Sequence, residues 1–377
     1  MQREKVYKHF LESEVEKRRI EKLLALEHFF QTSKDELAEE FRQSFKEICL
    51  SIRAQQLQMK KAPLGHITFS MLRTELLEGS HMYIVEGTDE NWFFDLEPFL
   101  ATYDASWAFR YLDQLVAELI EESKTFMGVI SEADIEAIQL KEAAHYHQYI
   151  ISLARYALPP SMITCPAYLD LEKEASVEIR VGEYRDISEV VYHEDHTVKD
   201  VEEIKAWLGE KEDEEYPFEV FSDLNLAGGD YEEMDLRYTF FQKSNLSRSN
   251  LRQCMLIGAN LKACELVEGD VSFSSIYEAD FSDSQLQGTS FRRVEGGGGL
   301  PNPNHWEMPG YLPVRFTGAN LEGTDFQHAD LRSACFVGAT FKDTDFTGAK
   351  LERAVFSKEA KDQLTLHPHQ EASIIWK

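Results

Sequence analysis

A five-residue repeat dominates the second half of the chain. In "FTGANLEGTDFQHADLRSACFVGATF", which runs from Phe316 to Phe341, a large apolar residue falls at every fifth position. A helix turns about 100° per residue, so five steps would place successive apolar residues about 140° apart. A flat strand has a side-chain period of two, so an odd repeat would throw them to alternate faces. The repeat therefore excludes both elements as a continuous structure.

A chain that turns a corner once in every five residues does satisfy this period. Each pentad is then a short extended side, and its large residue faces inward together with the small residue two places earlier. Four such sides would close a square coil, and stacked coils would form a solenoid. The rhythm holds for fourteen large residues from Leu226 to Phe291 and for nine from Phe316 to Phe356. At about 4.8 Å per coil, nearly six coils predict a stack about 28 Å long.

A glycine- and proline-rich insertion interrupts the repeat. The gap from Phe291 to Phe316 suggests twenty inserted residues, and "VEGGGGLPNPNHWEMPGYLPVR" predicts a loop over about 294–313. Loops on rigid scaffolds often carry function, and exposed Trp, Tyr and Met are common contact residues. The loop either binds a macromolecular partner or folds back over the coil beneath it. The candidate contact residues are Asn304, His305, Trp306, Met308 and Tyr311.

The stretch "ANLEGTDFQHADLRSACF" resembles the pentapeptide-repeat family, whose consensus is A(D/N)LXX, and the resemblance covers residues 226–356. It implies an all-β, right-handed quadrilateral β-helix. Some family members look like duplex DNA in shape and charge, bind type II topoisomerases such as gyrase, and confer antibiotic resistance or self-resistance. This chain differs because about 220 residues precede its solenoid and because arginines occupy several outward positions. These arginines are Arg237, Arg248, Arg252, Arg292, Arg293, Arg332 and Arg353.

The charge of the chain argues against direct nucleic-acid binding. Its 377 residues carry a net charge of −28, of which residues 51–220 hold −20 and the solenoid region 221–357 only −7. No apolar run reaches eighteen residues, so no membrane span is expected, and the charged N-terminus does not resemble a signal peptide. Five scattered cysteines fit a reducing cytoplasm. Cys254 and Cys264 take small inward positions, which favours core packing over metal or redox roles.

The first part of the chain predicts an α+β domain over residues 1–158. A helix over 3–31 and a second one capped by Ser33 would form a helical hairpin, which either packs within the domain or dimerises. Two or three strands follow from His66. Helices are expected over 106–125 and 132–157, the second started by Ser131 with Asp134 and ended by Pro159-Pro160.

The flanks of the solenoid predict caps for its two open ends. Residues 159–220 read as an acidic connecting segment whose amphipathic helix, in "VKDVEEIKAWLGEKEDEEY", would cover the first coil. Residues 358–377 predict a short helix and an apolar tail, "ASIIWK". That tail either seals the last coil or joins a partner, so a homodimer through the tail or the hairpin is one expectation.

No motif in the chain demands catalysis. His145 and His147 lie about 200° apart on a predicted helix and cannot share a metal ion. The clusters "YHEDH" and "HPH" are weak metal candidates, and there is no P-loop, nucleophile elbow or HExxH. No cofactor or metal site is therefore predicted. The sequence favours a non-catalytic interaction or scaffold protein; the alternative is an enzyme or biosynthetic accessory protein with a small-molecule site in the α+β domain.

Overall fold

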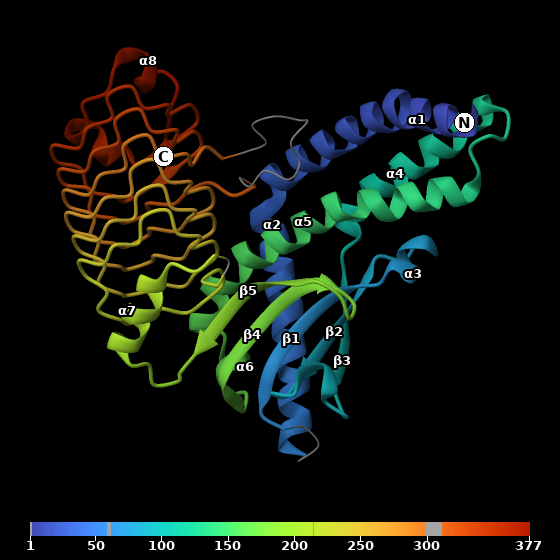
Figure 1. Cartoon of the computed structure of the whole chain (residues 1–377), viewed down its shortest axis with the longest axis horizontal. Helices are drawn as coiled ribbons and strands as arrows, with labels where there is room; N and C mark the ends of the chain where they lie inside the picture. The colour runs from blue at the N-terminus through green and yellow to red at the C-terminus, as the bar shows by residue number, and fades with distance from the viewer. Residues whose placement is uncertain (1, 59–61, 214, 299–310) are drawn as a thin grey trace. The chain divides into compact units, whose positions relative to one another are not determined.

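The structure is a computed structural model that describes residues 2–58, 62–213, 215–298 and 311–377. These residues form two compact units, of which the first ends at His196 and the second begins at Thr197 (Figure 1). The first unit contains helices and a sheet, and the second contains stacked coils. The predicted combination of an α+β domain and a β-helix is therefore correct at the level of fold class.

One long helical segment opens the first unit. α1 (Gln2–Phe10), the π-helical turn η1 (Leu11–Val15) and α2 (Glu16–Leu57) follow one another without a break. The predicted hairpin is therefore wrong. Buried residues continue at intervals of three and four on both sides of Ser33, so one helix buries them all. Thr32 donates its hydroxyl hydrogen bond to the carbonyl of His28, within the same helix, and no new cap forms.

A mixed five-stranded sheet packs against these helices in the order β3-β2-β1-β4-β5. The central pair, β1 and β4, is parallel, and the other neighbouring pairs are antiparallel. The strands are β1 (Leu64–Met71), β2 (Met82–Thr88), β3 (Phe99–Asp104), β4 (Lys173–Glu183) and β5 (Ser188–Asp195). The remaining helices are α3 (Arg73–Leu77), η2 (Trp92–Phe94), α4 (Ser106–Ser123), η3 (Lys124–Phe126), α5 (Glu132–Thr164) and α6 (Pro166–Leu169).

The predicted boundary at residue 158 differs from the structure in two ways. The Ser131–Asp134 start of α5 is confirmed, because the Ser131 N–H donates to Asp134 at 2.8 Å and the Asp134 N–H donates back at 3.3 Å. However, α5 continues through Pro159-Pro160 to Thr164. The strand predicted in the connecting segment is β4, which belongs to the first unit because it pairs with β1. Only residues from Thr197 onward precede the coils.

In the second unit, residues that precede an inward large residue form parallel bridges to the residue twenty positions later. Examples are Asn225 with Asn245 and Met255 with Ser275. One coil therefore contains four pentads. The short strands β6 (Cys335–Phe336), β7 (Val355–Phe356) and β8 (Ile375–Trp376) continue the same register. The right-handed sense and the square cross-section stay predictions.

The coil core consists of stacked side chains. Phe281, Phe316 and Phe336 stack at ring distances of 5.2 and 5.1 Å, and Phe356 continues the column at 4.7 Å. The small inward positions hydrogen-bond to the preceding coil: Thr289 donates to the carbonyl of Leu266 at 2.7 Å. The thiols of the two inward cysteines donate in the same way, and burial raises the pKa of each to about 12. Cys254 and Cys264 are core residues, as predicted.

The corners of the coils use a left-handed backbone. The residue two places after the inward large residue has a positive φ in nearly every described pentad, and it is glycine in seven of them, for example Gly228 at φ +70°. The Asp or Asn before the large residue accepts the N–H at the corner, as Asp345 does from Thr347 at 2.8 Å. The A(D/N)LXX pattern thus encodes both the inward packing and the corner.

Both ends of the coil stack are covered (Figure 1). At the first coil, α7 (Val201–Glu210) packs Leu208 and Trp207 against the core, as predicted for the amphipathic helix. At the last coil, η4 (Lys358–Gln363) and α8 (Pro368–Glu371) lie over the edge, and Gln370 donates to two coil carbonyls at 2.8 Å each. The tail pairs with β7 of its own chain. It therefore seals the solenoid within one molecule.

Candidate functional site

The insertion is shorter than the sequence predicts. Asp280 pairs with Arg315 and Glu295 with Asp330, in each case 35 positions later rather than twenty, so fifteen residues are inserted. The difference arises at Gly296, which occupies an inward position. A Cβ there would lie 2.8 Å from Cγ1 of Ile276 and 3.4 Å from Cγ1 of Val314. Because Val314 fills the space that a large residue normally takes, the sequence shows no apolar marker at Gly296.

The returning end of the insertion is held by a buried carboxylate. Glu278 accepts the backbone N–H groups of Tyr311 and Leu312 at 2.8 and 3.3 Å, and Glu278 and Tyr311 are both buried. Tyr311 therefore lies against the solenoid, and its assignment as a partner-binding residue stays a prediction. Asn304, His305, Trp306 and Met308 lie outside the described residues, so their role stays a prediction.

An exposed aromatic residue lies beside the start of the insertion. Phe273 is 45% exposed and stands at a corner with φ +65°. The guanidinium carbon of Arg252 lies 5.1 Å from its ring centroid and that of Arg293 lies 5.8 Å away. Met255 is the only other exposed large apolar side chain among the described residues of the coils. We call Arg252, Phe273 and Arg293 the Phe273 patch.

The Phe273 patch contrasts with the charge pattern around it. Many solenoid carboxylates have a structural partner: Asp280 pairs with Arg315 at 2.9 Å, and Asp330 with Arg332 at 2.8 Å. Although burial alone would raise it, the neighbouring Arg315 lowers the pKa of Asp280. Arg252 is paired with Asp270 at 3.2 Å, whereas Arg293 has no ion pair among the described residues.

The sequence contained the signal for Phe273. The five-residue phase puts residue 273 at an outward corner, so its side chain lies outside the apolar core of the coils. The loop can be predicted because it breaks the repeat. Phe273 is harder to find because it keeps the phase of the repeat and differs only in being aromatic at an outward position. Arg252 and Arg293 were noted only as outward charges.

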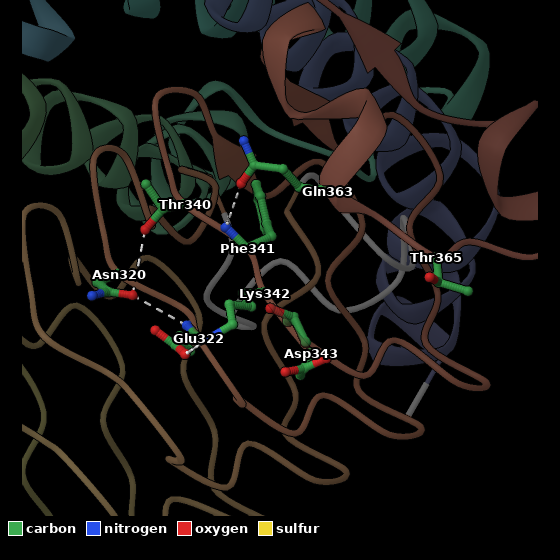
Figure 2. A pocket seen from close by; sticks show the side chains of 9 residues that line it. Asn320, Glu322, Thr340, Phe341, Lys342, Asp343, Gln363 and Thr365 are labelled. Atoms are coloured by element: carbon green, nitrogen blue, oxygen red, sulfur yellow. Dashed lines mark hydrogen bonds and ion pairs between the residues drawn. The ribbon is translucent and has the colours of Figure 1, made fainter.

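A hollow in the surface of the solenoid lies elsewhere, near its C-terminal cap (Figure 2). It has a volume of about 630 Å³. Lys342 pairs with Glu322 across it, Thr340 donates to Asn320 at 3.4 Å, and Gln363 from η4 accepts the N–H of Phe341 at 3.1 Å. These polar groups satisfy one another.

The histidines noted in the sequence occupy separate environments. His147 is buried and accepts or donates a 2.7 Å hydrogen bond with the Tyr83 hydroxyl, whereas His145 lies 3.8 Å from Glu142. His196 contacts Glu194, and His367 contacts His369. Across the described ranges, no group of three or more His, Cys, Asp or Glu side chains is placed to hold a metal ion. No helix in those ranges is long and apolar enough to cross a membrane.

The family comparison agrees with the geometry of the second unit. The model for pentapeptide repeats matches eight copies, over residues 220–253, 254–293 and 314–348. The second unit is therefore a pentapeptide-repeat domain, and pentapeptide-repeat proteins fold as right-handed β-helices. The matched segments stop before the insertion and resume after it. No curated protein matches the chain.

Several solved pentapeptide-repeat proteins are similar to part of the chain. HetL, involved in heterocyst differentiation regulation in the cyanobacterium Nostoc sp. strain PCC 7120, is 25% identical over 36% of this chain and 60% of its own, with a TM-score of 0.22. Rfr23 from the cyanobacterium Cyanothece 51142 is 18% identical over 37% and 64%, with a TM-score of 0.21. QnrB1, a plasmid-mediated fluoroquinolone resistance protein, is 13% identical over 43% and 83%, with a TM-score of 0.22. The chain thus spans less than two thirds of the length of the first two.

Proposed function

We propose that this chain is a non-catalytic interaction protein whose solenoid presents the Phe273 patch and the adjoining insertion to a protein partner. The observation that carries the proposal is the exposed Phe273 ring between Arg252 and Arg293. Aromatic and arginine side chains dominate the energetic centres of protein interfaces. Phe273 lies outside the apolar core of the coils, so core packing does not explain its presence.

The solenoid suits this role because its backbone is fixed on every side. Backbone N–H groups donate to the next coil throughout the described repeats, for example Phe291 to Asp325 at 2.7 Å. Because its rings are stacked and its ends are capped, the solenoid has little internal flexibility. A rigid surface loses little conformational entropy when it binds. The predicted quadrilateral cross-section would give it four flat faces, one of which carries the Phe273 patch.

A type II topoisomerase is one specific partner within this proposal. Resemblance to the pentapeptide-repeat family suggested it in the form of a DNA mimic. The many Asp–Arg pairs reduce the negative surface that a DNA mimic needs, so we favour contacts through the Phe273 patch and the loop. A supercoiling assay with purified gyrase at micromolar concentrations of the chain tests this version. Unchanged supercoiling would remove the topoisomerase and leave the interaction role open.

The insertion is tested by deletion of residues 299–310 with a short glycine bridge. This design keeps Gly296, Val314 and the Glu278 contacts to Tyr311 and Leu312, so the coils retain their register. We expect the deletion variant to lose the partner that the wild-type chain captures, and to keep the melting temperature of the wild type. Retained capture would exclude the loop as a contact. Sedimentation of the full chain tests the predicted homodimer separately.

A further inference from the structure

The first unit contains a small polar cavity on the face of its sheet opposite α2. In the β1–β2 pair, Thr68 lies directly across from Glu86. Direct cross-strand partners point to the same side, and Thr88, two residues beyond Glu86, shares that side. The other face is occupied by α2, whose Phe41 packs on Phe69 with a ring distance of 5.3 Å. The cavity therefore does not belong to the core between the sheet and that helix.

The segment before β3 forms one wall of this cavity and is held in place firmly. Trp92 stacks on His66 at 5.0 Å, and the guanidinium of Arg180 lies 4.8 Å from its ring. Gly65 allows the turn to approach β1, because a Cβ there would lie 2.8 Å from the carbonyl oxygen of Asp89. Trp92 also has φ +51°, a costly conformation for a large residue. Such strain is most often kept at functional sites.

Three buried polar groups in this cavity lack a partner among the described residues. They are the hydroxyls of Thr68 and Thr88 and the indole N–H of Trp92, and all three residues line one cavity of about 30 Å³. The two threonines are only 4% and 5% exposed. A buried polar group without a hydrogen bond is unfavourable, and three around one cavity indicate a site for a ligand. The volume suits about two water-sized atoms.

The chemistry of the lining selects the ligand. The indole N–H of Trp92 only donates, so the occupant must accept a hydrogen bond. The carboxyl group of Glu86 lines the same cavity, so an occupant that also donates is favoured. An anionic group would face the carboxyl groups of Glu86 and Asp95, and a cationic group would face Arg185, all three of which line the cavity. A neutral amide group meets both requirements and avoids both repulsions.

Apolar side chains beside the cavity provide room for the rest of such a molecule. Phe93 lines the cavity and is 44% exposed. Leu100 lies across from Glu86 on β3 and is 62% exposed. We propose that this cavity binds the neutral amide group of a small molecule whose aromatic or aliphatic body lies against Phe93 and Leu100. This site is independent of the Phe273 patch.

Three matched probes test the proposal on the full-length chain. Benzamide donates and accepts, benzoate only accepts and carries a negative charge, and benzylammonium only donates and carries a positive charge. Binding is followed by the indole ¹H–¹⁵N NMR signal of Trp92, which the Trp92→Phe variant identifies. We expect benzamide to move this signal in a saturable way. Benzoate and benzylammonium at the same concentration should bind at least tenfold more weakly.

Two variants separate the site from a structural role. The double variant Thr68→Val/Thr88→Val removes both hydroxyls at nearly constant volume and should weaken benzamide binding at least tenfold without lowering the melting temperature. Thr102→Val, on β3 across from Ile84, is the matched control and should bind normally. The proposal is overturned if benzamide gives no saturable shift, if the three probes bind equally, or if the double variant binds benzamide as the wild type does.

Discussion

Buried hydroxyl groups are treated differently in the two units of the molecule. In the coils, inward threonines such as Thr289 and Thr324 donate to a carbonyl of the preceding coil at 2.7 and 2.9 Å. In the sheet of the first unit, Thr68 and Thr88 are also buried, but their hydroxyl groups have no partner among the described residues. The buried hydroxyl groups of the coils thus stabilise the fold, whereas those of Thr68 and Thr88 can still form a hydrogen bond with a ligand. Regular parts of the chain specify the fold, and the exceptions point to function.

The largest expected effect concerns inward and outward phenylalanines. Phe316 stacks between Phe281 and Phe336, so Phe316→Ala should destabilise the coils by about 3–5 kcal/mol through the cavity it leaves. Phe273→Ala, at an exposed corner, should change stability by less than about 0.5 kcal/mol. Denaturant titration, monitored by hydrogen exchange in peptides from the coils, measures the change in unfolding free energy for both variants. Equal losses would show that Phe273 is a packing residue.

A pH titration distinguishes the first unit from the coils. Burial lowers the pKa of His147 to about 4, below the value of about 6.5 expected for an unfolded chain. Protonation therefore favours unfolding: the stabilisation is complete above about pH 6.5 and is lost as the pH falls toward 4, by about 3 kcal/mol.

The variant His147→Gln isolates this effect from the many carboxylates. It keeps an acceptor for the Tyr83 hydroxyl but does not titrate, so the difference in unfolding free energy between wild type and variant should shrink between pH 6.5 and 4. Urea unfolding of the first unit, followed by hydrogen exchange, measures it. A difference that is constant with pH would contradict the buried neutral histidine.

The comparison of hydroxyl groups predicts that Thr→Val substitution changes stability in opposite directions in the two units. Thr289→Val removes the hydroxyl hydrogen bond to the carbonyl of Leu266, which keeps its bond from the Gly269 N–H at 3.0 Å, and should cost about 0.5–1.5 kcal/mol. Thr68→Val removes a buried group that has no partner and should be neutral or stabilise by up to about 1 kcal/mol. Thermal and denaturant unfolding of the two variants provide the test. Destabilisation of similar size in both would mean that the Thr68 hydroxyl has a partner in solution.

The smallest expected effect compares two open glycines. Neither Gly228 nor Gly209 has an atom within 4 Å of an added Cβ, but Gly228 has φ +70° and Gly209 lies in α7. Gly228→Ala should cost about 1 kcal/mol, since the left-handed conformation strains alanine. Gly209→Ala should stabilise by up to about 1 kcal/mol. The same sign in both variants would show that the corner conformation does not control stability.

The coils could be predicted because their period is local. A single pentad states which residue faces inward, and the phase of the repeat then locates the inward residues from Leu226 through Phe356. The insertion was overcounted because Gly296 takes a large inward position without an apolar side chain, and only the packing reveals that Val314 of the neighbouring small position lies against it. In the first unit, β1 pairs with β4 across more than a hundred residues, and no local pattern shows that. The unpartnered groups around Trp92 lie on the β1–β2 pair and in η2, and only the packing shows that they lack hydrogen-bond partners, so the sequence could not predict the cavity.

The Phe273 patch gives the most direct test that exceptions to the repeat carry the interaction. Tagged full-length chain is used to capture partners from lysate of the source cells, and the double variant Phe273→Ser/Arg293→Ser is compared with Arg248→Ser by quantitative mass spectrometry. Arg248 is the matched control because it is also an exposed corner residue. We expect the proteins enriched by the wild type to be lost with the double variant and kept with the control. If both variants retain the same proteins, the Phe273 patch is not the interaction surface.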